Sequence, residues 1–395
     1  MTAASVRNLG IALVAAGIAA RFALVAASVG TIDAELFERY GSEINEFGLY
    51  ESYRQDARLN HPPIAALWFA ATWKVAQRID VSFVTLFKSQ VALADCATIA
   101  LLWLIVRRRA DASTAWLAAV FWACNPNAIL VSAYPCNSDA ALTMLAVLSL
   151  WLVENARRPL LAGLAIGAAI NIKLTASVVL IPILLLSRRR GELLSLSAGA
   201  ALAAVPMLWV WAGLGYRFRQ RVLEYHPAPT GWGLHNLLDL LSNHPLLKSY
   251  FDVVAERYLR AGGAVILLSV TLATLVLWRW HADRIFACAI AVAVYAVVSP
   301  VMAMHHTILV GPFLLLWSFP AGIAWGLLAG AATFSCYLFG WVGTLPMRST
   351  QTAYGTGPYP MLAAVLWTWI VIWTWRTLHG QRQHSLARTL QSFPP

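Results

Sequence analysis

Apolar blocks of about 14 to 24 residues, separated by short polar segments, run along most of the chain. A membrane-spanning helix needs about 20 apolar residues, whereas a transmembrane barrel shows alternation over short strands. The pattern predicts an all-α fold, a polytopic transmembrane helical bundle of about 11 to 13 spans, in a single integral membrane domain over residues 1–395. After a first block at about 8–30, the expected spans lie at about 83–106, 113–132, 139–155, 160–172, 174–187, 191–212, 261–279, 284–304, 306–318, 320–342 and 360–377.

Basic residues gather at the ends of these blocks, which indicates how the chain is oriented. Cytoplasmic loops are enriched in Lys and Arg. We therefore expect a multi-pass protein of the cell inner (plasma) membrane with both termini cytoplasmic. The clusters assigned to the cytoplasmic side are Arg107–Arg109, Arg157–Arg158, Arg188–Arg190, the residues at 279–284 and the tail from Arg376.

One apolar block does not fit that topology as a span. Residues 62–78 are short and begin with Pro-Pro, and a crossing there would place the arginine clusters outside. We therefore predict an interfacial or re-entrant helix. Three segments then form a layer on the outer face, at 31–82, 213–260 and 343–359. Loops of the length of the first two are usually functional when they are ordered.

The composition supports a membrane protein and limits its partners. Hydrophobic residues make up 59% of the chain and charged residues 12%, whereas soluble proteins carry about 25% charged residues. The net charge of +11 comes from topology clusters, so we expect the lipid bilayer as a partner and no nucleic acid. The five cysteines are scattered without a metal or disulfide pattern, and no P-loop or Rossmann fingerprint is present, so no cofactor is expected.

Acidic residues are concentrated in the first outer segment, which begins at Thr31. Asp33 lies just past the first span, and two interpretations are open for it. As a charge in the first turn of a helix capped by Thr31 it would only stabilise that helix. As a carboxylate at a low-dielectric boundary it would keep enough basicity to act as a general base. On a helix, Asp33, Phe37 and Tyr40 share one face.

Several polar residues fall inside or at the ends of the apolar blocks. Charges in such positions are costly and mark a site or a pathway, unless they form a buried ion pair. A buried ion pair could form between Lys88 and Asp95, or between Lys173 and Asp95. For Lys173, which we place near a bend between two short helices, phosphate binding is the alternative. Asp139 lies at the outer end of the following block, in YPCNSDA.

Two further segments offer groups for an anionic, sugar-bearing ligand. In the second outer segment, Arg217 and Arg219 alternate with aromatic residues and suit a phosphate headgroup, and Trp232 offers a stacking face for a sugar. The alternative is an amphipathic interfacial helix followed by a turn. His305 and His306 lie at the outer end of a later block. Adjacent helical residues diverge by about 100°, so the pair alone makes a poor metal site.

The order of these features resembles the GT-C superfamily of membrane glycosyltransferases. The chain is most similar to the polyprenyl-phosphate-mannose-dependent branch and to bacterial glycosyltransferase family 87. The resemblance is spread over roughly residues 8–320 and rests on short motifs in a fixed order: IDAELFERYG, EFGLY, NHPP, LFKSQVALADCATIALL, NPNAILVSAYPCNSDA, AGLAIGAAINIKLTAS, GWGLHN and HHTILVGP.

The resemblance implies a sugar donor linked to polyprenyl phosphate, used on the outer face, with a cell-envelope glycan or glycolipid as acceptor. It implies that Asp33 is the base, and that Lys173 with His305 or His306 belongs to the donor phosphate site. Related enzymes often carry a second acid just before the Pro-Pro, where this chain has Asn60 and His61. Three alternatives stay open: Asp56 or Asp139 serves as the second carboxylate, or the site uses one acid. We assign His61, with Tyr40, Asp139 and Trp232, to substrate binding. No acidic pair for a metal is evident, so metal independence is implied.

Two other classes of function remain as alternatives. A transporter or flippase of lipid-linked sugars would also hold polar groups in the membrane, but it usually shows two matching halves, which this sequence lacks. A membrane acyltransferase or phosphotransferase would use a reactive histidine with a partner acid, and His305 and His306 keep that alternative open.

Overall fold

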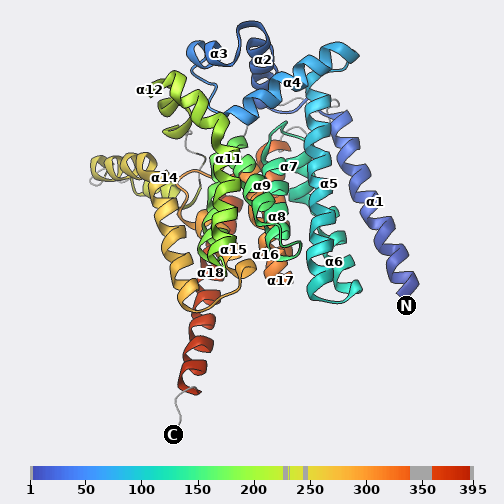
Figure 1. Cartoon of the computed structure of the whole chain (residues 1–395), viewed down its shortest axis with the longest axis vertical. Coiled ribbons are helices and arrows are strands. Elements are labelled where there is room, and N and C mark those ends of the chain that lie inside the picture. Colours follow the sequence, from blue (N-terminus) through green and yellow to red (C-terminus); the bar gives the residue numbers. More distant parts are fainter. Residues whose placement is uncertain (1–2, 226–229, 231, 243–247, 339–357, 392–395) are drawn as a thin grey trace.

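The structure is a computed structural model that describes residues 3–225, 230, 232–242, 248–338 and 358–391 (Figure 1). These residues form eighteen α-helices and no strand, with three short 3-10 or π turns. The predicted all-α bundle is therefore confirmed for the described part of the chain. The third outer segment, at 343–359, lies almost wholly outside the described residues.

Among the described residues, six helices are long and apolar enough to cross a membrane. They are α1 (Ala3–Ala27), α5 (Phe83–Arg109), α11 (Arg190–Leu214), α14 (Lys248–Arg279), α17 (Phe319–Leu338) and α18 (Tyr359–Gln391). α6 (Ala112–Ala123) and α7 (Pro126–Ala133) pass the same test as a pair bent by 50°. The bend falls where Asn125 caps α7, its side chain accepting from the Asn127 and Ala128 amides, ahead of Pro126. The chain is therefore a multi-pass membrane protein.

Shorter apolar helices fill the middle of the bundle. They are α8 (Asp139–Glu154), α9 (Pro159–Ile172), α10 (Ser177–Leu185), α15 (Arg284–Val298) and α16 (Thr307–Trp317). Lys173 breaks the helical conformation between α9 and the 3-10 turn η1 (Leu174–Ala176). Its backbone is extended, with φ −158° and ψ 131°. The predicted bend at Lys173 is therefore present. How many of these short helices cross a bilayer stays a prediction.

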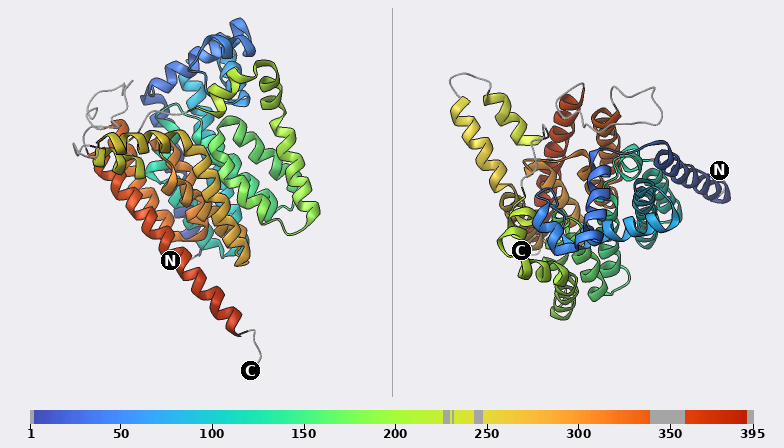
Figure 2. Two further views of the ribbon diagram at one scale, coloured as in Figure 1. Left: turned by 90° about the vertical axis from the view of Figure 1, so that its left-hand side faces the viewer. Right: turned by 90° about the horizontal axis from the view of Figure 1, so that it is seen from above.

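A layer of helices covers one end of the bundle (Figures 1 and 2). Its members are α2 (Ile32–Phe47), α3 (Leu49–Gln55), α4 (Pro63–Ile79) and α12 (Tyr216–Phe218) with the π turn η2 (Arg219–Leu223). α4 is the apolar block that we assigned to an interface, and it does not meet the length and hydropathy criteria for a span. The start of α1 and the end of α18 lie toward the opposite end of the bundle (Figure 1).

The second outer segment is shorter than the sequence suggested. After α13 (Gly233–Ser242), helix α14 begins at Lys248 instead of near 261. The first turns of α14 are polar, and a hydrophobicity pattern therefore assigns them to a loop although the backbone is already helical.

The predicted cytoplasmic arginine clusters meet at the end of the bundle opposite to the layer. Arg109, Arg188 and Arg284 all pair with Glu154, at 3.5, 3.5 and 2.6 Å. Arg284 also pairs with Glu192. The connections that carry these residues therefore lie on one side, as the charge pattern predicts. That this side is the cytoplasm stays a prediction.

Glycines allow α9 and α11 to pack backbone to backbone. A Cβ at Gly163 would lie 2.1 Å from the Leu196 carbonyl oxygen, and one at Gly199 would lie 2.2 Å from the Leu160 carbonyl oxygen. Small residues at such crossings are typical of helix packing in membranes, where close van der Waals contact drives association. This packing holds α9, and with it Lys173 at its end.

Candidate active site

The first turn of α2 is fixed by contacts on both sides of the α1–α2 junction. The buried Lys88 ammonium donates to the Val25 carbonyl at 3.2 Å and to the Ser28 carbonyl at 2.7 Å. It therefore neutralises carbonyls at the C-terminal end of α1. Thr31, the residue before α2, donates its hydroxyl to the Pro135 carbonyl at 2.8 Å. The start of α2 is thereby docked on the segment that precedes α8.

Asp33, in the first turn of α2, lies against the same segment. Its Oδ2 accepts a 2.9 Å hydrogen bond from the Asn137 amide. Burial raises the pKa of the Asp33 carboxyl, while the Asn137 hydrogen bond and the charge of Lys173 act in the opposite direction. Asp33 is half-buried, and its raised pKa makes it a better proton acceptor than a solvated aspartate.

A cluster of polar side chains lies at the ends of the short helices. Lys173 Nζ is 2.8 Å from Asp139 Oδ2, and His305 Nε2 is 3.9 Å from the same oxygen. Ligating atoms of Asp139, His305 and His306 all lie within 4.8 Å of one another. The charge of Lys173 also lowers the pKa of Asp33, and the charge of Asp139 raises it. Five of the predicted site residues therefore share one site, although they come from distant parts of the sequence.

Two tyrosines hold the histidine rings. The Tyr295 hydroxyl is 3.2 Å from His306 Nδ1, and the Tyr337 hydroxyl is 3.1 Å from His305 Nδ1. The histidines occupy the 3-10 turn η3 (Met304–His306), which places both rings near Asp139. Sequence reasoning assumed an α-helical divergence for this pair and did not foresee the convergence.

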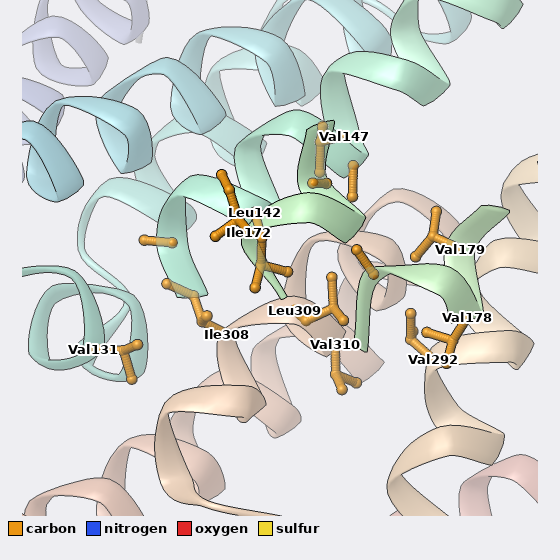
Figure 3. Packing of buried hydrophobic residues seen from close by; sticks show 14 of the residues in the cluster. Val131, Leu142, Val147, Ile172, Val178, Val179, Val292, Ile308, Leu309 and Val310 are labelled. Atoms are coloured by element: carbon orange, nitrogen blue, oxygen red, sulfur yellow. The ribbon is translucent and has the colours of Figure 1, made fainter. Parts of the chain in front are cut away.

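Apolar residues that neighbour the cluster in sequence belong to the buried packing of the bundle, in which Figure 3 labels Leu142, Ile172 and Ile308. Leu142 follows Asp139 by one turn of α8, Ile172 precedes Lys173, and Ile308 follows the histidines; all three are buried. The helix from Asp139 to Glu154 is about 24 Å long at 1.5 Å per residue, against a hydrocarbon core of about 30 Å. The cluster therefore lies inside the membrane thickness if the arginine end is at one membrane surface.

His61 lies just ahead of α4, near enough to Lys173 and Asp139 for both charges to act on its ring. Its ring packs edge-on against Phe37 and Phe69, with centroids at 4.9 and 5.3 Å. Burial, with the charge of Lys173, lowers the pKa of His61 to about 3, and Asp139 opposes the shift. The ring is therefore neutral at physiological pH and offers a hydrogen bond without a charge.

Other residues that we assigned to substrate contacts lie elsewhere. Tyr40 is buried and donates its hydroxyl to the Arg58 carbonyl at 2.7 Å. Trp232 is fully buried and donates its indole N–H to the Ala296 carbonyl at 2.9 Å, so it has no open face for a sugar in this structure. Arg217 is exposed, and Arg219 is exposed and pairs with Glu224 at 2.6 Å.

The ion pairs that we considered between buried groups are wrong. Asp95 pairs with neither Lys88 nor Lys173, because it accepts from Arg21 at 2.8 Å and from the Trp122 indole at 2.9 Å. Arg21 Nη groups also donate to carbonyls, including that of Gly17 at 2.9 Å. This pair joins α1, α5 and α6 and is structural.

Of the acids considered for a second carboxylate, only Asp139 lies in the cluster. Asp56 pairs with Arg39 at 2.5 Å on the outer layer. The YPCNSDA segment contributes more than its acid, since Tyr134, Asn137 and Ser138 each keep a buried side-chain oxygen without a partner among the described residues. Unpaired buried polar atoms in a site are available to a substrate.

Comparison with known families gives one match. Residues 60–303, more than half of the chain, match the family described as glycosyltransferase family 87. Comparison with curated proteins and with solved structures gives no match. The matched region includes His61, Asn137, Asp139 and Lys173, and it ends just before the histidine pair. The chain, a multi-pass membrane protein with this polar site at the ends of its short helices, belongs to glycosyltransferase family 87.

Proposed function

We propose that this glycosyltransferase moves a sugar, mannose or another hexose or pentose, from a polyprenyl-phosphate donor to a cell-envelope glycan or glycolipid acceptor. The reaction would take place on the outer face of the inner membrane, at the Asp33 side of the bundle. The convergence of Asp33 and Asn137 with Lys173, Asp139 and the histidines, described above, is the observation that carries this proposal.

The site provides a carboxylate, Asp33, to accept a proton and an ammonium group, Lys173, to stabilise negative charge, as such a transfer requires. Asp33 accepts the proton of the acceptor hydroxyl as its oxygen attacks the anomeric carbon of the donor sugar. The bond from that carbon to the phosphate oxygen breaks, and polyprenyl phosphate leaves with the electron pair. Lys173, 2.8 Å from Asp139, stabilises the charge that develops on the phosphate.

The position of the site favours a lipid-linked donor over a soluble one. The cluster of Lys173, Asp139 and the histidines borders buried apolar side chains. With the arginine end of the bundle at one membrane surface, the cluster would lie within the membrane thickness, where a phosphate on a lipid chain would reach it from the bilayer. A polyprenyl phosphate is already a good leaving group, and the protein therefore has to supply only a base, cations and alignment. The exposed Arg217 and Arg219 would act at the entrance instead of on the reacting phosphate.

The experiment is transfer from radiolabelled polyprenyl-phosphate-mannose by membranes that contain matched amounts of wild type, Asp33→Asn or Glu35→Gln. Glu35 is an exposed acid in the same helical turn and serves as the control. We expect loss of transfer in Asp33→Asn alone. Equal transfer by Asp33→Asn and wild type would refute the assigned base, and no transfer by any form would count against this donor.

A further inference from the structure

Asp139, His305 and His306 together have the ligand set of a divalent metal site. Their ligating atoms lie within 4.8 Å of one another. In a tetrahedral zinc site the ligand atoms lie about 3.4 Å apart, so side-chain movements of under about 1 Å would close the geometry. Asp139 is almost fully buried, and each element that contributes a ligand is held in the bundle core.

The tyrosines orient the imidazoles for such a role. In the tautomer with the proton on Nδ1, His306 donates to the Tyr295 hydroxyl oxygen and His305 donates to that of Tyr337. Both Nε2 atoms then keep the lone pair that a metal requires. Outer contacts of this kind, from the second imidazole nitrogen to an oxygen, accompany most metal-bound histidines.

The charge balance of the site also favours a cation. With neutral imidazoles, Asp33, Asp139 and Lys173 sum to −1, and the phosphodiester of a lipid-linked sugar would bring the total to −2. Uncompensated charge is costly away from water. A divalent cation makes the loaded site neutral, and it would also offset the negative charge that the phosphate gains when its bond to the sugar breaks.

We propose that Asp139, His305 and His306 bind a divalent transition-metal ion, whose open coordination positions receive the phosphate of the donor. Two imidazoles and a carboxylate suit Zn²⁺ or Mn²⁺ better than Mg²⁺ or Ca²⁺. Lys173 shares Asp139 with the metal, and its positive charge weakens metal binding until an anion arrives. Metal and phosphate therefore bind cooperatively. This inference deepens the proposed function and replaces the metal independence that the family resemblance implied.

The first test is Zn²⁺ binding by the full-length, tag-free protein in detergent after treatment with EDTA, measured by calorimetry with and without farnesyl phosphate. We expect one Zn²⁺ per chain and tighter binding in the presence of the phosphate. His306→Gln removes a ligand, and Tyr295→Phe removes only the hydroxyl that orients that ligand. We expect both to weaken binding by about tenfold or more. His281→Gln, at an exposed histidine outside the site, should bind as wild type does.

Several results would overturn the inference. They are no Zn²⁺ binding by the wild type with or without farnesyl phosphate, unchanged Zn²⁺ binding by a monodisperse His306→Gln variant, and equal weakening by His281→Gln. Transfer that continues undiminished in excess EDTA would also overturn it, while leaving the proposed function intact. Metal binding with the expected variant pattern, but no transfer from a polyprenyl-phosphate sugar, would support the metal site and count against the proposed donor.

Discussion

The Asn137 amide donates a 2.9 Å hydrogen bond to Asp33 Oδ2 although the two residues are 104 positions apart in the sequence. The contact joins the outer layer, which carries the proposed base, to the bundle, which carries the cluster of Lys173, Asp139 and the histidines. Thr31 and Pro135 form a second link between the same two segments. The position of the base relative to the donor phosphate therefore depends on this junction.

Replacing Asn137 by alanine should change the pH dependence of transfer. The hydrogen bond from Asn137 lowers the Asp33 pKa against the effect of burial, so its loss raises that pKa further. The base is active when deprotonated, and the acid limb of kcat/KM should therefore move to higher pH. Loss of a hydrogen bond to a carboxylate should also lower kcat/KM by about tenfold at the optimum.

The measurement is a pH profile of transfer for wild type, Asn137→Ala and the control Asn155→Ala. Asn155 follows the opposite end of α8 and does not contact the site. An acid limb that stays in place, or moves to lower pH, in Asn137→Ala would contradict the assignment of Asp33 as the titrating base.

The Lys173–Asp139 pair should contribute to both stability and activity, and a double variant separates the two. Lys173→Met leaves the buried Asp139 carboxylate unpaired, which costs about 3–5 kcal/mol of folding stability when one partner of a buried pair is removed. Lys173→Met with Asp139→Asn removes both charges and should recover most of the thermal stability. Transfer should be lost in both variants, because the Lys173 ammonium no longer stabilises the charge that develops on the donor phosphate.

Thermal unfolding in detergent and transfer per mole of folded protein measure the two effects. Transfer that returns with stability in the double variant would show that Lys173 only balances Asp139.

The hydrophobicity pattern predicted the class of fold, and it singled out several residues that the structure brings together in the candidate site. Polar residues at the ends of apolar blocks cost free energy in a membrane, so they are kept mainly where they have a function. This cost identifies Asp33, Asp139, Lys173 and the histidines. The pattern could not assign partners to buried charged groups, since those partners come from distant segments of the sequence. Examples are the pairing of Asp95 with Arg21 and the hydrogen bonds from Lys88 to carbonyls at the end of α1.

The failures have physical causes as well. Trp232 was expected to bind sugar because glycine and aromatic residues in a loop suit a carbohydrate, but tertiary packing buries its ring and satisfies its N–H. The sequence did not identify Tyr295 and Tyr337 as site residues, because a tyrosine within an apolar helix cannot be distinguished from a core residue by pattern alone. The structure shows each hydroxyl beside a histidine ring.

The buried Arg21–Asp95 pair should matter for stability and not for chemistry. Asp95→Asn leaves the Arg21 guanidinium with only carbonyl partners in a position with no solvent exposure. We expect a loss of about 3–5 kcal/mol, seen as a lower midpoint of thermal unfolding. Asp80→Asn, at an exposed position, should stay within about 0.5 kcal/mol of wild type. Transfer per mole of folded Asp95→Asn should equal that of wild type, and a specific loss would place Asp95 in the site.

Close packing of α9 on α11 should be needed to hold Lys173 in place. In Gly163→Ala the new methyl carbon would lie 2.1 Å from the Leu196 carbonyl oxygen, so the two backbones must separate. Overpacking of this kind costs about 1–3 kcal/mol, and the movement of α9 should also lower transfer.

Gly191→Ala is the matched control, because nothing lies within 4 Å of its added Cβ and it sits in the first turn of α11. We expect it to stabilise the protein slightly, since alanine restricts the unfolded chain. Unfolding midpoints and transfer rates of the two variants form the test. If Gly163→Ala matched Gly191→Ala in both, the α9–α11 crossing would be able to relax without cost, and Lys173 would owe its position to Asp139 alone.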